Sequence, residues 1–223
     1  MASEGGEADG ASAFSGLGRS ILLVGAHADD VEINAGGSIH KWREQGRQVR
    51  VAILAAEDAH LRHVESLAAC MHLDVEHVDA LGGPDTSLHD WVHELIGPVE
   101  RILRTHAVDT VLTHFHADTH QDHVSAYRIV AAAARKVPNF LMFKPTFPSG
   151  RSDIPFQPNV VSLLSAANMR AKVRALDAFE SQRIKYGEDD WGRAMHAVAQ
   201  GDAWTYAGVH GFAEVFQLGR IRI

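Results

Sequence analysis

The segment S-I-L-L-V-G-A-H-A-D-D, residues 20–30, decides the fold, because an apolar run ends there in a cluster of histidine and aspartate. The same pattern recurs at residues 109–123, D-T-V-L-T-H-F-H-A-D-T-H-Q-D-H. A short apolar run with polar boundaries is typical of a buried β-strand, so we predict strands over 20–26 and 109–114. Each is followed by imidazole and carboxylate groups at spacings that one divalent metal ion can use.

The rest of the chain alternates apolar runs with stretches of helical period. We predict further strands over 48–55, 75–79, 140–143 and 212–218, and helices over 36–45, 60–73, 88–105, 122–136 and 168–182. The segments 81–85, 144–158 and 186–210 are predicted to be turns and loops. Alternating strands and helices favour a mostly parallel sheet with both faces covered. The predicted fold class is therefore α/β, a Rossmann-like three-layer fold with a mostly parallel central sheet.

The two histidine and aspartate clusters are expected to meet in space. In open parallel sheets, ligands bind beyond the carboxyl ends of the strands, where the strand order reverses. With the order 3-2-1-4-5, that point lies between the first and fourth strands, over 20–26 and 109–114. These are the strands that the two clusters follow, so the topology predicts one shared site.

Composition limits the classes of function. The 223 residues fit one domain, which we place at 20–223, after a disordered N-terminal tail at 1–19. The net charge of −7 argues against a nucleic-acid partner. The one cysteine, Cys70, excludes an intramolecular disulfide and a multi-cysteine zinc site. No stretch is long and apolar enough for a membrane span, and no signal peptide is evident, so we expect a cytoplasmic protein. For the oligomeric state, both a monomer and a homo-oligomer stay open.

The residue types in the two clusters favour catalytic zinc. His27, Asp30 and His123 supply two nitrogens and one carboxylate and leave a coordination position open. Asp29 can then take a proton from a coordinated water, whose pKa zinc lowers to about 7. His120 is expected to stabilise the oxyanion of a tetrahedral intermediate, and Asp122 to orient the His120 ring. The structural alternative is that an isolated H-x-x-D only caps a helix.

Two motifs carry a resemblance to a known family. A-H-A-D-D-V-E-I-N-A-G-G-S-I, residues 26–39, and D-T-H-Q-D-H, residues 118–123, resemble the signatures of the PIG-L/LmbE-like zinc-dependent N-deacetylases. Weaker matches are Arg62-x-x-Glu65 and L-G-G-P-D-T-S-L at 81–88. The chain departs from the family pattern at Ala28, where proline is usual, and at Val124, where arginine is common.

The resemblance implies a function and a set of roles. It implies His27, Asp30 and His123 as zinc ligands, Asp29 as general base, and His120 with Asp122 on the oxyanion side. The implied substrate is a small N-acetylated molecule, an amino sugar or its conjugate, which loses its acetyl group. We further expect substrate contacts from Arg62, by the motif, and from His210, which lies on a late loop.

Two other functions stay open at this stage. A non-haem iron oxygenase also uses two histidines and one carboxylate, although it has no need of a base such as Asp29. A metal-binding regulator or scaffold on the same fold would have little reason to keep Asp29 and His120. Metal analysis separates zinc from iron, and acetate release separates an enzyme from a scaffold.

Overall fold

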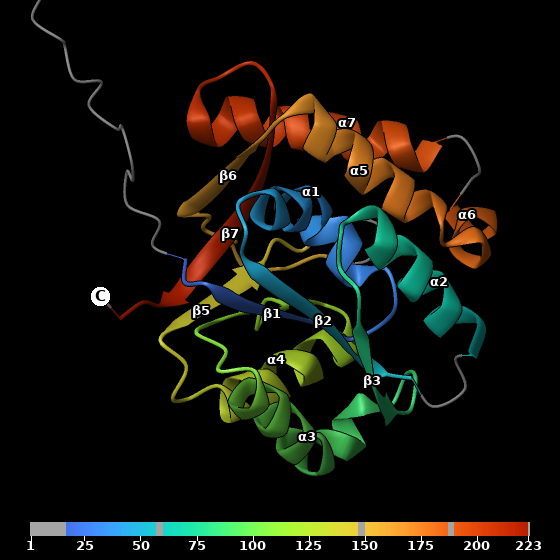
Figure 1. The fold of residues 1–223 in the computed structure, drawn as a ribbon, viewed down its shortest axis with the longest axis vertical. Helices are drawn as coiled ribbons and strands as arrows, with labels where there is room; N and C mark the ends of the chain where they lie inside the picture. Colours follow the sequence, from blue (N-terminus) through green and yellow to red (C-terminus); the bar gives the residue numbers. More distant parts are fainter. Residues whose placement is uncertain (1–16, 57–59, 147–149, 187–189, 223) are drawn as a thin grey trace, which may run out of the picture.

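A seven-stranded sheet lies at the centre of the computed structural model, which describes residues 17–56, 60–146, 150–186 and 190–222 (Figure 1). The strand order is β3-β2-β1-β4-β5-β7-β6. The described residues form one α/β domain, as the sequence predicts. Most of the predicted N-terminal tail, residues 1–16, lies outside the described residues.

The first five strands are parallel and confirm the predicted order 3-2-1-4-5. Their bounds are β1 (Ser20–Gly25), β2 (Gln48–Ala55), β3 (Val78–Gly83), β4 (Thr110–Thr113) and β5 (Asn139–Phe143). Strand β1 pairs with β2 on one side and with β4 on the other, so the order reverses at β1. The connections that follow β1 and β4 therefore leave the same edge of the sheet side by side.

The far edge of the sheet differs from the prediction. Strand β7 (Phe212–Arg220), which the sequence predicts, pairs antiparallel with β5 and with β6 (Val160–Leu164). Strand β6 was not predicted, because its five residues directly follow a proline-rich stretch.

The prediction of a turn at 81–85 is also wrong in part, because β3 runs on to Gly83. The β2–β3 register shifts between Ile53 and Ala55, and Gly82 has a φ of 75°, so a bulge extends the strand where a turn was expected.

Two apolar cores lie on opposite faces of the sheet, and Figure 1 shows helices above and below the strands. Helices α1 (Asp30–Glu44), α2 (His60–His72), α5 (Ala166–Asp177) and α7 (Asp190–Asp202) cover one face. Helices α3 (Val92–Thr105) and α4 (Gln121–Ala133) cover the other. The predicted helix at 168–182 is divided into α5 and the short α6 (Glu180–Tyr186).

Two predictions about helical segments are wrong. Helix α1 begins at Asp30 rather than at residue 36, and Gly36 and Gly37 lie inside it. A Cβ on Gly37 would come within 2.5 Å of Leu164, so glycine permits close packing there and is not a boundary. Helix α7 occupies a stretch that was predicted to be loop.

Within the described ranges, no helix has the length and apolar character that crossing a bilayer requires.

Candidate active site

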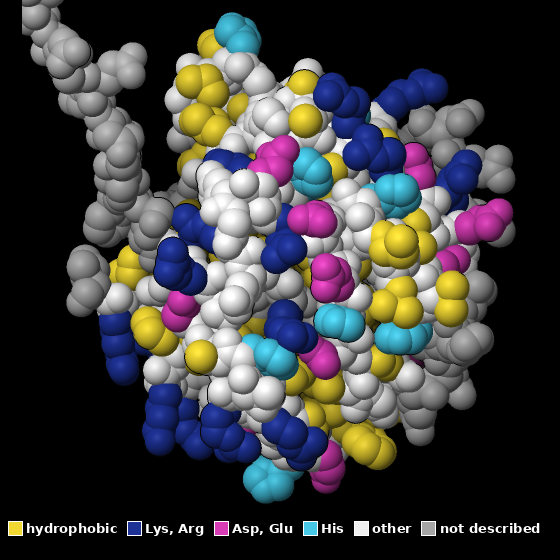
Figure 2. Space-filling model, in the orientation of Figure 1, with side chains coloured by type: hydrophobic (Ala, Val, Ile, Leu, Met, Phe, Trp, Pro, Cys, Tyr) yellow, Lys and Arg dark blue, Asp and Glu magenta, His cyan; other side chains and the backbone are white. Residues whose placement is uncertain are grey.

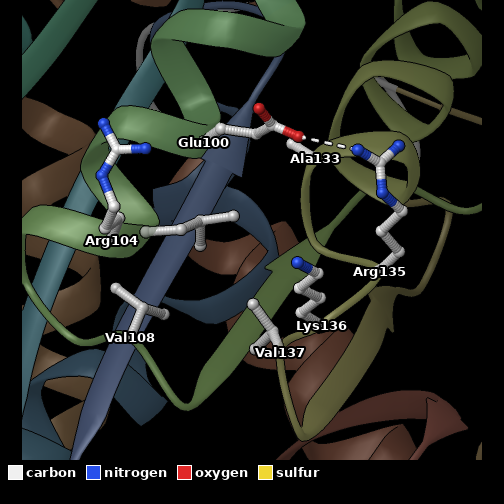
Figure 3. Close-up of a pocket in the computed structure, with 8 residues that line it drawn as sticks. Glu100, Arg104, Val108, Ala133, Arg135, Lys136 and Val137 are labelled. Atoms are coloured by element: carbon white, nitrogen blue, oxygen red, sulfur yellow. Dashed lines mark hydrogen bonds and ion pairs between the residues drawn. The ribbon is translucent and has the colours of Figure 1, made fainter.

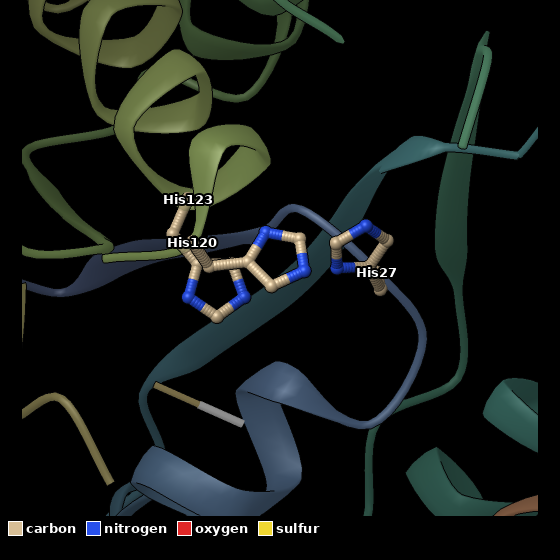
Figure 4. Close-up of side chains that lie close together, drawn as sticks. All are labelled: His27, His120 and His123. Atoms are coloured by element: carbon tan, nitrogen blue, oxygen red, sulfur yellow. The ribbon is translucent and has the colours of Figure 1, made fainter. Parts of the chain in front are cut away.

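The two clusters meet where β1 and β4 end, as the topology predicts (Figure 4). His27 Nδ1 lies 3.5 Å from one oxygen of Asp30, and His123 Nε2 lies 3.4 Å from the other. The rings of His27 and His123 have centroids 5.8 Å apart. Among the described residues, two overlapping groups of potential metal ligands share His123: His27–His120–His123 and Asp30–His114–His123.

Asp30 is the buried centre of the cluster. One carboxylate oxygen accepts the backbone N–H of His27 at 2.8 Å and lies 3.2 Å from His114 Nε2. Burial alone would raise the pKa of Asp30, but the imidazoles of His123 and His114 lower it well below the usual range. Asp30 is therefore an ionised acceptor in a site lined by imidazole nitrogens.

Two of the histidines around Asp30, His27 and His123, carry positive charge, whereas burial lowers the pKa of His114 to about 4 and keeps that ring neutral. Burial alone would lower the pKa of His123, but Asp30 and Asp118 raise it to about 9. The same balance, with Asp122 and Asp30 as the main partners, raises the pKa of His27 well above the usual range. His27 and His123 are therefore both protonated at neutral pH.

Asp29 begins the turn into α1 with a strained backbone. Its φ of 98° lies in the range that favours glycine, and its side chain makes no capping hydrogen bond to the helix. Burial and the charge of Asp30 raise the pKa of Asp29 well above the usual range, and Arg62 opposes them. Arg62 lies 3.9 Å from the Asp29 carboxylate and donates to the Ala28 carbonyl at 2.8 Å. The predicted substrate contact Arg62 therefore lies beside Asp29.

His120 and Asp122 lie at the start of α4. The Nδ1 atom of His120 accepts the backbone N–H of Asp122 at 3.2 Å, and the His120 ring stacks on that of His123 with centroids 4.4 Å apart. The Asp122 carboxylate lies 3.0 Å from His27 Nε2 and accepts the backbone N–H of Leu88 at 3.0 Å. The expected partner of His120 therefore contacts His120 through its backbone, and His27 through its side chain.

Three residues of the site received no firm role from the sequence. Asp118 lies 2.9 Å from His123 Nδ1, and His114 is buried against Asp30. Asp85, on the loop after β3, lies 3.2 Å from His27 Nε2, and the hydrogen bond from His27 lowers the pKa of Asp85 to about 2. Asp85 and Asp118 lie in the motifs at 81–88 and 118–123, and their place in these motifs is the sequence feature that could have identified them.

His210 is not brought to this cluster in the structure. It lies before β7 beside Trp204, with ring centroids 5.0 Å apart, and lines a separate hollow of about 390 Å³ with Trp204 and Val209. On the face shown in Figure 2, several histidine side chains are exposed at separate places. The richness in histidine is therefore only partly explained by the site.

A larger cavity also lies away from the cluster. The cavity of about 420 Å³ in Figure 3 lies between α3 and α4, where Glu100 and Arg135 form an ion pair at 3.2 Å. It is lined by none of the predicted site residues.

Comparisons with known proteins identify the family and support the fold. Residues 22–134 match the family model PIG-L, described as GlcNAc-PI de-N-acetylase. The uncharacterized deacetylase YaiS of Escherichia coli K12 is 27% identical over 173 residues, which cover 73% of this chain and 91% of YaiS.

Solved structures share the fold at lower identity. The zinc-inhibited form of teicoplanin deacetylase Orf2 has a TM-score of 0.75 at 18% identity, covering 89% of this chain and 97% of Orf2. GalB, the 4-carboxy-2-hydroxymuconate hydratase of Pseudomonas putida KT2440, has a TM-score of 0.73 at 19% identity, covering 92% and 98%. These two likenesses concern the fold alone, whereas the family match spans both clusters of the site. The chain belongs to the PIG-L family of deacetylases.

Proposed function

We propose that this protein is a zinc-dependent deacetylase that hydrolyses the amide of an N-acetyl amino sugar or a conjugate of one. The observation that carries the proposal is the convergence of His27, Asp30 and His123, with Asp29 and His120 beside them. The description of the family as GlcNAc-PI de-N-acetylase supports an acetylated amino sugar as the substrate class.

The chemistry of the donor set fits a divalent cation. An ionised Asp30 faces His27 and His123, and both histidines hold protons that a metal would displace. The side chains of Asp30 and His123 are each 2% exposed, so a cation held there would be shielded from bulk water on the protein side. When bound by His27, Asp30 and His123, zinc supplies Lewis acidity and lowers the pKa of a water molecule to about 7.

Asp29 takes the proton from the attacking water in this proposal. The positive charge of a bound cation and of Arg62 favours the ionised form of Asp29, against the burial that raises its pKa. A buried carboxylate with a raised pKa is also able to pass its proton on to the leaving amine. The backbone conformation of Asp29 fixes the direction of its Cα–Cβ bond and so limits the positions that the carboxylate can reach.

His120 donates a hydrogen bond to the substrate carbonyl in this proposal. Burial and the nearby charges of His123 and His27 lower the pKa of His120, which makes the ring neutral at pH 7. Because Nδ1 accepts the backbone N–H of Asp122, the remaining proton lies on Nε2. A neutral N–H donor is therefore available for the oxygen on which negative charge develops.

Asp122 supports the metal side of the site as well. Its carboxylate accepts from Nε2–H of His27, which leaves Nδ1 of that ring, on the Asp30 side, for the cation. We retain Arg62 as a substrate contact because it borders Asp29, and propose His210 only as an outer contact for a larger conjugate.

Acetate release tests the proposal. Purified protein is analysed for bound metal and then incubated with N-acetylglucosamine and larger N-acetylated amino-sugar conjugates. We expect the wild-type protein to bind zinc and to release acetate. The Asp29→Asn variant should keep the zinc and lose the acetate release. Metal binding without release from any member of the panel would support a scaffold, and iron as the native metal would support the oxygenase alternative.

A further inference from the structure

Asp118 joins three parts of the site through one carboxylate. Its Oδ2 lies 2.9 Å from Nδ1 of His123, on the side of the ring away from Asp30. Its Oδ1 accepts the backbone N–H of His120 at 2.9 Å and that of Arg151 at 3.4 Å. The Asp118 side chain is 2% exposed, so solvent does not replace these contacts.

The contact with Oδ2 fixes the protonation of the His123 ring. A carboxylate only accepts hydrogen bonds, so Nδ1 of His123 holds a proton. The lone pair of the neutral ring is then on Nε2, the atom that faces Asp30. A histidine held in this way is prepared to bind a metal without a change of tautomer.

The same carboxylate ties the segment 150–152 to the metal side of the site. Thr119 donates its N–H to the Arg151 carbonyl at 2.9 Å, and Asp118 and Ser152 form an isolated antiparallel bridge. Gly150 lies so close that a Cβ there would come within 2.4 Å of Asp118 Oδ2. A side chain at position 150 therefore requires the Asp118 carboxylate or the backbone around Gly150 to move, and either shift changes how segment 150–152 meets the carboxylate that holds His123.

We propose that Asp118 is the positioning residue of this site: it sets the tautomer of His123 for metal binding and couples metal affinity to the placement of residues 150–152. The inference rests on the proposed role of His123 as a metal ligand. It assigns a function to Asp118 that does not involve contact with the substrate.

The Asp118→Asn variant tests the tautomer directly. In this variant the two backbone donors of His120 and Arg151 keep the amide oxygen, so the NH₂ group faces His123 and moves the ring proton to Nε2. We expect zinc to bind 10- to 100-fold more weakly, measured by chelator competition on the full chain. Asp153→Asn, an exposed aspartate in the same region, is the matched control and should leave the affinity unchanged.

The Gly150→Ala variant tests the coupling to the loop without replacing Asp118 or any proposed ligand. We expect zinc affinity to fall about tenfold, while Gly201→Ala, where a Cβ meets nothing within 4 Å, leaves it unchanged. The thermal midpoint of the metal-free protein is measured for each variant, because a merely structural role lowers that midpoint and not the affinity.

The outcomes separate this inference from the proposed function. If His123→Ala abolishes zinc binding and Asp118→Asn keeps the wild-type affinity, the positioning role is wrong and the ligand set stands. If Gly150→Ala binds zinc as wild type does, the coupling to residues 150–152 is wrong. If the wild-type protein binds no zinc, the proposed function itself fails.

Discussion

Replacing Asp29 by glycine should stabilise the metal-free protein and abolish most of its activity. The backbone of Asp29 has φ 98° and ψ −28°, a conformation that costs a residue with a Cβ about 1–3 kcal/mol. Glycine adopts it freely but gains about 0.5–1 kcal/mol of conformational freedom in the unfolded chain. The variant also removes a buried carboxylate next to Asp30, so we expect a net gain of about 1–2 kcal/mol. In a chain of this length, this corresponds to about 2–8 °C in the thermal midpoint.

The matched controls are Asp29→Ala and Asp29→Asn. Alanine also lacks the carboxylate but keeps the Cβ, so the difference in unfolding free energy between the glycine and alanine variants isolates the backbone strain. Asparagine keeps the shape of the side chain and should lose activity by a factor of about 10² or more, with the metal retained. Unfolding is measured with a chelator present, and turnover by acetate release. An alanine variant as stable as the glycine variant, or an asparagine variant of near-normal rate, would refute the reasoning.

Three further predictions concern other parts of the structure. Zinc binding at pH 7 should release protons, because the pKa of His123 is raised to about 9 and zinc binds the neutral ring. The apparent affinity for zinc should therefore rise with pH up to about 9. Calorimetry in buffers of different ionisation enthalpy measures the number of protons released. Glu214→Ala should lower the free energy of unfolding by about 3–5 kcal/mol in urea titrations, because it leaves Lys172, 2.7 Å from Glu214 and 4% exposed, with a buried uncompensated charge. Cys70 should react with thiol reagents only on unfolding, because burial and Glu32 raise its pKa; rapid labelling of the native protein would contradict this.

The order of the five parallel strands could be predicted because the apolar runs and the polar clusters that follow them can be read from short stretches of sequence. The apolar runs of β1 and β4 each end at a polar cluster, and parallel strands joined by helices allow few orders. The meeting of His27, Asp30 and His123 follows from that order.

The parts that could not be predicted depend on contacts that are distant in the sequence. Strand β6 is held by its antiparallel ladder with β7, about 50 residues later, and is too short to be recognised by itself. The partner of Asp122 differs from the expected one because the fold brings His27 within 3.0 Å of its carboxylate, a proximity that spacing along the chain does not show. The role we propose for Asp118 likewise depends on residues 150–152, which the bridge to Ser152 places beside it.

The most direct test of the account is the position of zinc in a crystal of the zinc-loaded protein, located by anomalous scattering at the zinc edge. We predict one site bonded at about 2.0–2.2 Å to His27, Asp30 and His123, with Asp29 beside it and uncoordinated. Zinc bound instead by Asp30, His114 and His123 without His27, or no bound zinc at all, would contradict it.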